Sequence, residues 1–242
     1  MRKGNWILSV IVVLGLGLSA IAQQGPKAAS LIFREDFKTE PPGQVQLTPA
    51  ALANTNLELK VYGPGAKPGV GRDSGLLLGQ EEDPTNPGKM ISMVYTGVVE
   101  GNWGILLRDK NNYLDLRDTG RLRWRVRARS LHQIRPLIKL SDGTLLVGDY
   151  EEPLSSYMRE SDLYLVDVPR WRPLNPATMY EDRNKPGEPL WKTTVDLSKV
   201  DEIGFTTLMG GAGHGTSGNL AVDLIEVYGT PVRRAAAQSQ AR

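Results

Sequence analysis

Charged and apolar residues alternate strictly from Arg121 to Arg129. Arginine occupies every odd position, and an apolar residue occupies every even one. A period of two places alternate side chains on opposite faces of a β-strand. The pattern therefore predicts a strand with one apolar face, which buries Trp124. The opposite face carries guanidiniums about 7 Å apart, twice the rise per residue of a strand.

Short β-rich segments recur along the chain between turns rich in glycine and proline, and no helical period or internal repeat is found. Loops are expected at Glu81–Gly88 and in the irregular, proline-rich segment Glu151–Pro189. This spacing predicts an all-β fold, a two-sheet antiparallel sandwich of jelly-roll type. Further strands are expected at Leu31–Phe37, Leu57–Tyr62, Leu76–Gly79, Met90–Val99, Gly104–Arg108, Tyr113–Leu116, Ile134–Leu140, Thr144–Asp149, Leu163–Val168, Trp171, Trp191–Leu197, Glu202–Met209 and Leu220–Tyr228.

The two ends of the chain differ in composition from this body. Residues 1–22 have a positive start, an apolar run and an Ala20-Ile21-Ala22 cleavage site, which together predict a signal peptide. We expect residues 23–30 to be a linker, 31–230 a β-jelly-roll domain, and 231–242 a disordered basic tail. The protein is then secreted or periplasmic and carries no membrane span once the signal is cleaved.

Charge and cysteine content exclude several classes of function. The formal net charge of +2 falls to zero without Arg2 and Lys3, and to about −3 without the arginines of the tail. A slightly acidic body argues against nucleic acid as a partner, because such binding needs a broad basic surface. The chain has no cysteine, so neither disulfides nor thiol chemistry contribute.

The arginine strand is the first candidate binding surface, with Arg123, Arg125 and Arg127 at its centre. Guanidiniums match the oxygens of carboxylates and sulfates, so this face can bind an acidic polysaccharide. The alternative is that the arginines pair with acids on neighbouring strands. Candidate partners are Asp115, Asp118, Asp149 and Glu151.

Acidic residues in the first and last strands form the second candidate. Glu35 and Asp36 lie near the start of the chain and Asp223 near its end. Such hard oxygen ligands can hold a structural Ca²⁺ between the ends of the fold. The alternative is that they are ordinary carboxylates at strand edges.

A glycine-rich loop and several aromatic residues complete the candidates. Residues 210–218 contain His214, a candidate ligand-binding residue or general base, although an exposed hairpin loop explains the same composition. Trp103 and Trp171 lie in loop-like contexts, where a ring face can stack on a sugar. Burial in the core is the alternative for both.

The bounding strands resemble a known group of folds. Phe33-Arg34-Glu35-Asp36-Phe37 and the final motif Val222 to Gly229 are similar to the first and last strands of galactose-binding-like jelly rolls, which include many carbohydrate-binding modules of secreted bacterial proteins. The resemblance covers about residues 31–229. It implies a carbohydrate ligand, and a structural calcium on Glu35 or Asp36 and on Asp223.

The sequence therefore predicts a secreted, monomeric, non-catalytic protein that binds a polysaccharide or cell-surface glycan. One alternative is a β-sandwich polysaccharide lyase or glycoside hydrolase. A lyase would pair an arginine of the ladder, by which we mean the odd-numbered arginines from Arg121 to Arg129, with His214, Tyr150 or Tyr157. A hydrolase would need two facing carboxylates. The other alternative is a structural or adhesive envelope protein. The fold alone does not choose among the three.

Overall fold

The computed structural model describes eight segments of the chain. The predicted signal sequence, His214 and the last seven residues of the predicted tail lie outside them. Among the described residues, no helix is long and apolar enough to cross a membrane. The segments are 29–38, 44–67, 74–83, 86–99, 101–128, 133–181, 190–208 and 220–235.

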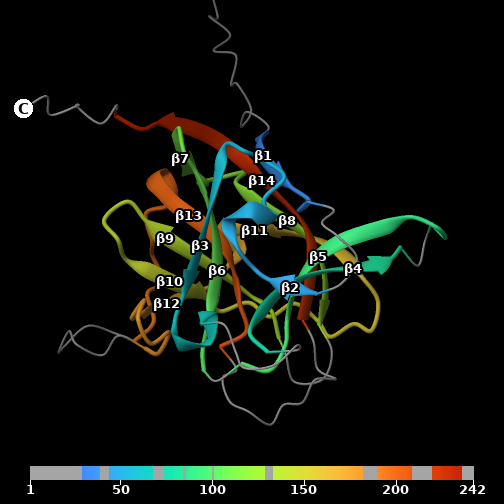
Figure 1. The fold of residues 1–242 in the computed structure, drawn as a ribbon. Coiled ribbons are helices and arrows are strands. Elements are labelled where there is room, and N and C mark those ends of the chain that lie inside the picture. The colour runs from blue at the N-terminus through green and yellow to red at the C-terminus, as the bar shows by residue number, and fades with distance from the viewer. Residues whose placement is uncertain are drawn as a thin grey trace, which may run out of the picture.

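The described residues form an all-β fold of two packed antiparallel sheets, as the sequence predicts (Figure 1). The arginine sheet contains β1 (Ser30–Glu35), β2 (Val45–Gln46), β4 (Leu76–Glu82), β5 (Met90–Thr96), β8 (Arg121–Ala128), β11 (Arg159–Tyr164) and most of β14 (Leu220–Arg233). The opposite sheet contains β3 (Leu57–Tyr62), β6 (Gly104–Asp109), β7 (Asn112–Asp115), β9 (Arg135–Leu140), β10 (Leu145–Gly148), β12 (Trp171–Leu174) and β13 (Val200–Thr206).

The last strand joins the two sheets. Residues 220–228 of β14 pair with β8 in the arginine sheet, and residues 230–233 pair with β7 in the opposite sheet. The first strand, β1, lies beside β14 along its other edge. The neighbouring first and last strands of the sequence prediction are thus confirmed.

The hydrophobic core fills the space between the sheets. In β8 the even residues are buried and the odd ones are partly exposed along its whole length. Trp124 is fully buried, and its indole Nε1 donates to Glu152 Oε2 at 3.1 Å. The predicted register of the arginine strand is confirmed.

Several predicted elements differ from the structure. Trp191–Leu197 is not a strand, since it contributes a single bridge at Lys192 and a 3₁₀ turn, Leu197–Lys199. The expected strand Leu163–Val168 is displaced, because β11 ends at Tyr164 and Leu165–Asp167 is a 3₁₀ turn. The structure also has 3₁₀ turns at Pro49–Ala51 and Pro64–Ala66.

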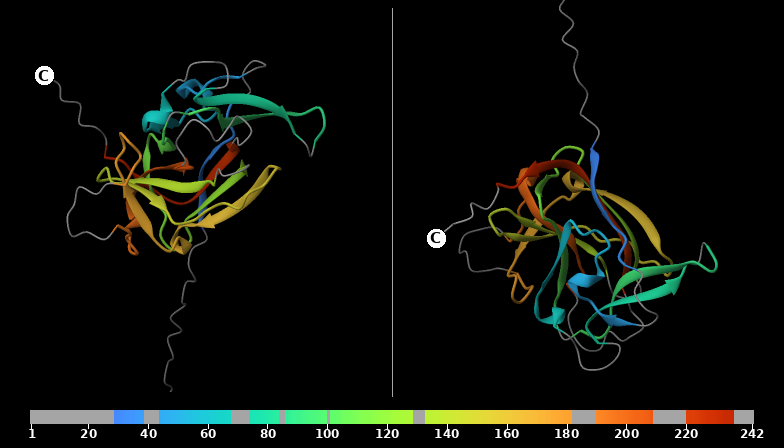
Figure 2. Two further views of the ribbon diagram at one scale, coloured as in Figure 1. Left: turned by 90° about the horizontal axis from the view of Figure 1, so that it is seen from below. Right: turned by 45° about the horizontal axis from the view of Figure 1, so that its top comes forward.

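The expected loop Glu81–Gly88 begins later than predicted, because β4 continues to Glu82. Glu81 pairs with Ile91, and Glu82 pairs with Met90 on β5. Both views of Figure 2 show this β4–β5 hairpin extending away from the body of the molecule. Its described pairing with the rest of the arginine sheet is short, since β5 pairs with β14 at Tyr95 and Val94, and β4 pairs with β2 at Leu77 and Leu78.

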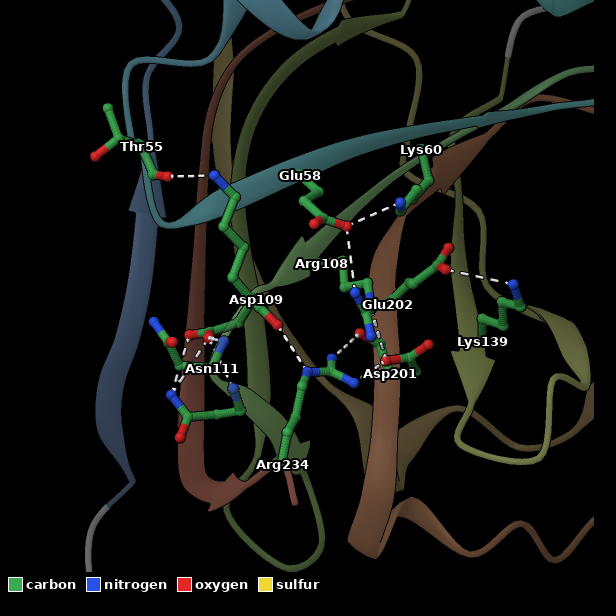
Figure 3. A network of polar contacts seen from close by, with 12 residues as sticks. Thr55, Glu58, Lys60, Arg108, Asp109, Asn111, Lys139, Asp201, Glu202 and Arg234 are labelled. Carbon is green, nitrogen blue, oxygen red and sulfur yellow. Dashed lines mark hydrogen bonds and ion pairs between the residues drawn. The ribbon is translucent and has the colours of Figure 1, made fainter. Parts of the chain in front are cut away.

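The basic tail also begins later than expected. Strand β14 continues through Arg233, and Arg234 is held by the opposite sheet. Its Nε donates to the carbonyl of Asp109 at 2.9 Å, and its Nη1 forms an ion pair with Asp201 (Figure 3). Its guanidinium also lies 4.1 Å from the ring centre of Tyr113. These contacts anchor the end of β14, so residues 231–234 belong to the domain.

Candidate functional site

The odd arginines of β8 lie on the outer face of the arginine sheet, between β11 and β14. The register places Arg123 beside Asp162 on one side and Glu226 on the other. Arg121 lies over the ring of Tyr228, 4.1 Å from its centre. Cross-strand neighbours of this kind are close enough for their side chains to interact.

Each described ladder arginine has an acidic partner, and Arg121 pairs with Asp162 at 3.4 Å. Arg123 binds Asp162 through two hydrogen bonds of 3.0 and 2.9 Å. This contact holds the pKa of Asp162 below its ordinary value. Arg125 binds Asp223 at 2.5 Å, and Arg127 forms an ion pair with Glu81. The described arginines of the ladder are therefore paired with acids, as in the alternative to a binding surface.

The acids named in advance as partners are not the ones that pair with the ladder. Asp115 binds Arg117, Asp149 binds Arg170, and Glu151 pairs with Arg135. Asp118 lies in a turn with a positive φ of 56°. Of the observed partners, Asp162 and Asp223 lie on β11 and β14, the strands that pair with β8, and Glu81 lies on β4.

The structure also corrects the placement of the two tryptophans proposed for stacking. Trp103 is 1% exposed and packs edge-on against Phe205, and Trp171 is 3% exposed at the start of β12. A ring buried to this degree presents no face to a sugar. However, the residues next to them, Asn102 and Arg172, line one pocket on the outer side of the opposite sheet.

We call this the Tyr180 pocket. It has a volume of about 510 Å³ and is lined by Asn102, Arg172, Leu174, Met179, Tyr180, Glu181 and Leu208. The buried side chains of Leu174 and Met179 give it an apolar base. Tyr180 is 64% exposed, so its ring is available at the edge of the pocket. An accessible ring above an apolar base can receive the flat face of a small molecule.

A short turn after β12 builds this pocket. The side chain of Asn175 accepts from the N–H of Ala177 at 2.9 Å, and the carbonyl of Tyr180 accepts from the N–H of Asn175. Asn102 then donates to the carbonyl of Met179 at 3.1 Å and ties the turn to the sheet. The turn is thereby fixed in the position that exposes Tyr180.

The charges beside the Tyr180 pocket are paired. Arg172 binds Glu181 at 2.5 Å, and its guanidinium lies 4.9 Å from the ring centre of Trp191. Arg170 lies over the same ring at 4.6 Å. Burial lowers the pKa of the neighbouring Arg135, an effect to which the charge of Arg172 adds. The Arg172–Glu181 pair offers donors and acceptors side by side without a net charge.

A second pocket, the Arg127 pocket, lies on the arginine sheet where the described ladder ends. Its volume is about 340 Å³, and of the predicted ligand-binding residues that the structure describes, Arg127 is the one that lines either pocket. Arg123 and Arg125 lie outside both. The residues that line the Arg127 pocket are Gln44, Gly79, Gln80, Glu81, Met93, Tyr95 and Arg127.

The three acids proposed as calcium ligands have other partners. The carboxylate of buried Glu35 accepts from the N–H groups of Phe37, Ala53 and Asn54, at 2.6 to 3.0 Å. Asp36 is exposed and pairs with Arg34, and Asp223 pairs with Arg125. Among the described residues no three acidic or histidine side chains converge on one point. As they stand, these residues do not fit a calcium site.

The tyrosines considered for a lyase are separated from the ladder. Tyr150 hydroxyl donates to Glu152 at 2.9 Å, beside Trp124 and thus on the core side of β8. Burial, together with the Glu152 carboxylate, raises the pKa of Tyr150 to about 12. Tyr157 is 75% exposed and lines neither pocket. The structure therefore brings no described tyrosine proposed for the lyase into a site with an arginine of the ladder.

Comparison with known proteins found no matching family model and no matching curated protein. Similar solved structures include two from Clostridium thermocellum. One is a family 11 carbohydrate-binding module in complex with a β-1,3-1,4-mixed-linked tetrasaccharide, with a TM-score of 0.41 and 16% identity over 81% of this chain and 100% of that one. The family 11 module of the cellulosomal cellulase Lic26A-Cel5E has a TM-score of 0.40 and 16% identity over 79% and 97%.

An exo-β-agarase is also similar, with a TM-score of 0.39 and 8% identity over 75% of this chain and 24% of the agarase.

Sequence reasoning missed the Tyr180 pocket itself. The motif Arg170-Trp171-Arg172-Pro173 and the dipeptide Asn102-Trp103 drew attention to the right neighbourhoods but to the wrong side chains. Successive residues of a strand point to opposite faces, so this rule would have placed Arg172 on the outer face and Trp171 on the inner face. Nothing in the sequence indicates that Tyr180 lines the same pocket as Asn102, which lies 78 positions earlier in the chain.

Proposed function

We propose that this chain is a non-catalytic carbohydrate-binding protein and that the Tyr180 pocket holds its ligand. The observation that carries the proposal is the 64% exposed ring of Tyr180 beside an apolar base and a neutral ion pair. Sugars present C–H groups on one face and hydroxyls around the edge. The C–H face is attracted to the negative face of an aromatic ring.

The polar residues of the pocket match the edge of such a ligand. Arg172 has N–H groups in a fixed fork, and Glu181 has acceptor oxygens next to it. Adjacent hydroxyls of one sugar can donate to Glu181 and accept from Arg172. Each contact of this kind contributes modestly, because hydrogen bonds to water are given up in exchange.

An uncharged glycan fits this pocket better than an acidic one. An acidic polysaccharide was the expectation drawn from the arginine ladder, whose described members already have partners. A ligand carboxylate would have to displace Glu181 from Arg172, or Glu81 from Arg127. A neutral sugar needs no such displacement, and its binding depends little on salt.

A binding role is also favoured over hydrolysis. Glycoside hydrolysis by the usual routes needs a pair of carboxyl groups roughly 5–9.5 Å apart. Of the described residues that line the Tyr180 pocket, Glu181 alone has a carboxylate. We propose export of the protein by the signal in residues 1–22, which would place it where polysaccharides occur.

An envelope protein without a small ligand is the second candidate. It is favoured by the pairing of the ladder arginines, which leaves the arginine sheet with a cross-linked, solvated face.

A depletion assay on the mature chain, residues 23–242, separates these possibilities. The neutral polysaccharides are mixed-linkage β-glucan, xylan, galactomannan and agarose, and the acidic ones are alginate and polygalacturonate. We expect retention on at least one neutral polysaccharide, unchanged between low and high salt, with no sugar released. Retention on acidic polysaccharides alone, weakening with salt, would support the acidic ligand. Release of sugar would support an enzyme, and no retention would support the envelope protein.

A further inference from the structure

The Arg127 pocket lies on a different sheet from the Tyr180 pocket. Its residues come from the segment before β2 and from β4, β5 and β8, whereas the Tyr180 pocket is built at β12 and the turn that follows it. Figure 1 shows β4 and β5 on one side of the molecule and β10 and β12 on the other, and the second view in Figure 2 agrees. A ligand in one pocket therefore leaves the other accessible.

The base of the Arg127 pocket is a small apolar cluster that is distinct from the main core. Buried Met93 and Tyr95 belong to it, together with Leu77, Ile91 and Ala221. A side chain at Gly79 would fill part of this space, because its Cβ would lie 2.6 Å from Cε1 of Tyr95. Glycine at this position lets the ring of Tyr95 lie close to the strand and keeps the pocket open.

The polar edge of the pocket is an ion pair held in a fixed position. The side chain of Arg127 is 11% exposed, and its guanidinium contacts Glu81 and the sulfur of Met93. Glu81 is more exposed, and Gln44 is exposed at the opening. A paired guanidinium and carboxylate, an amide and an apolar base are thus common to both pockets, whereas the exposed ring belongs to the Tyr180 pocket.

We propose that the Arg127 pocket is a second saccharide-binding site and that the protein is bivalent, with one site on each sheet. This inference rests on the proposed function, since it assigns the same class of ligand to a second place. The pairing of Arg127 with Glu81 favours hydroxyls over an anion, because an anion would compete with the carboxylate.

Bivalency gives the protein a different role from that of a single binding module. Two sites on separate faces cannot both contact one short oligosaccharide, but they can hold two polysaccharide chains or two distant parts of one chain. Retention on a polymer then exceeds the affinity of either site by avidity. The protein would cross-link the polysaccharide as well as adhere to it.

The test measures how many saccharide molecules bind to each chain, in two pocket variants and one control. Tyr180→Ala removes the exposed ring from one pocket, and Gln44→Trp blocks the opening of the other with a large side chain at an exposed position. Tyr157→Ala removes an exposed tyrosine that lines neither pocket and is the matched control. Thermal melting of each variant confirms that it folds, and Arg127→Lys replaces Gln44→Trp if that variant does not.

The probe is a hexasaccharide from whichever neutral polysaccharide of the depletion assay retains the protein. Calorimetric titration should give two bound molecules per chain for the wild type and Tyr157→Ala, and one for Tyr180→Ala and Gln44→Trp. The wild type should also make the soluble polymer turbid by cross-linking, and both pocket variants should lose this effect.

Three results would overturn bivalency. One bound molecule, abolished by Tyr180→Ala and unaffected by Gln44→Trp, would reject the second site and leave the proposed function intact. One bound molecule that depends on Gln44 alone would move the function to the Arg127 pocket. An absence of binding to every neutral and acidic polysaccharide would reject the proposed function itself.

Discussion

Arg125 and Asp223 form an ion pair across the arginine sheet, with Nη2 2.5 Å from Oδ2. Asp223 lies at the register shift between Val222 and Leu224, where β14 has one residue more than β8. A β-bulge of this kind redirects a side chain. Here it places the buried carboxylate on the same face as the arginine.

The pair should show strong coupling in a double-mutant cycle. Asp223→Ala and Arg125→Ala should each cost about 1–3 kcal/mol, because each leaves a partly buried charge without its partner. The double variant should cost less than the sum of the two single changes. Chemical denaturation of the four proteins measures this, and strict additivity would show that the contact does not exist in solution.

Asp223 should also affect the pH dependence of stability. Burial raises the pKa of Asp223 above its ordinary value of 3.8, although Arg125 opposes this. The folded state therefore binds this proton more tightly than the unfolded chain does. Its favourable contribution is greatest below pH 3.8 and is lost as the pH rises through the higher, folded pKa. Subtracting the unfolding curves of Asp223→Asn from those of the wild type between pH 3 and 7 should reveal this decline.

The buried face of β8 gives a direct test of the core. Trp124→Ala should cost roughly 3–5 kcal/mol, as a large-to-small change in a packed interior. Trp124→Phe should cost less, about 1–3 kcal/mol, mainly because it removes the donor to Glu152. Arg123→Ala, on the exposed face of the same strand, is the comparison and should lower the stability far less, because ion pairs between exposed groups contribute little. Equal losses for the two faces would contradict the register.

The end of β14 should depend on Arg234 and not on its neighbour. Arg234→Ala removes the contacts with Asp109 and Asp201 seen in Figure 3, together with the contact to the ring of Tyr113, and should cost about 1–3 kcal/mol. Arg233→Ala changes an exposed arginine one position away and should alter the melting temperature very little. If the two variants melt alike, the anchoring by Arg234 is wrong.

The sequence predicted the features that depend on local alternation and missed those that depend on register. The alternation of residue types alone predicted which side chains of β8 are buried and which are exposed. The partners Asp162 and Asp223 lie 39 and 98 positions from the arginines they bind, so only the folded sheet identifies them. The predicted ends of strands were wrong for a related reason. β4 extends to Glu82 because β5 supplies a partner for each residue, which its loop-like composition does not indicate.

The candidate site was predictable only in part. Arg127 was named in advance, and the tryptophans at 103 and 171 directed attention to segments that do border a pocket. The aromatic residue that the structure exposes there is Tyr180, which lies in a proline-rich segment with no strand period. Its exposure results from the turn at Asn175 and from the contact between Asn102 and Met179, both of which are tertiary features.

Electrophoresis of the mature protein through gels containing the retaining neutral polysaccharide tests the central claim most directly. Tyr180→Ala removes an exposed ring without opening a cavity, so the variant should fold normally. Its Tyr180 pocket should bind about tenfold more weakly, as expected for the loss of one aromatic contact and the area it buries. Tyr180→Phe should migrate like the wild type, and so should Tyr157→Ala. Unchanged retardation of Tyr180→Ala, with folding intact, would contradict the assignment of the Tyr180 pocket as the carbohydrate site.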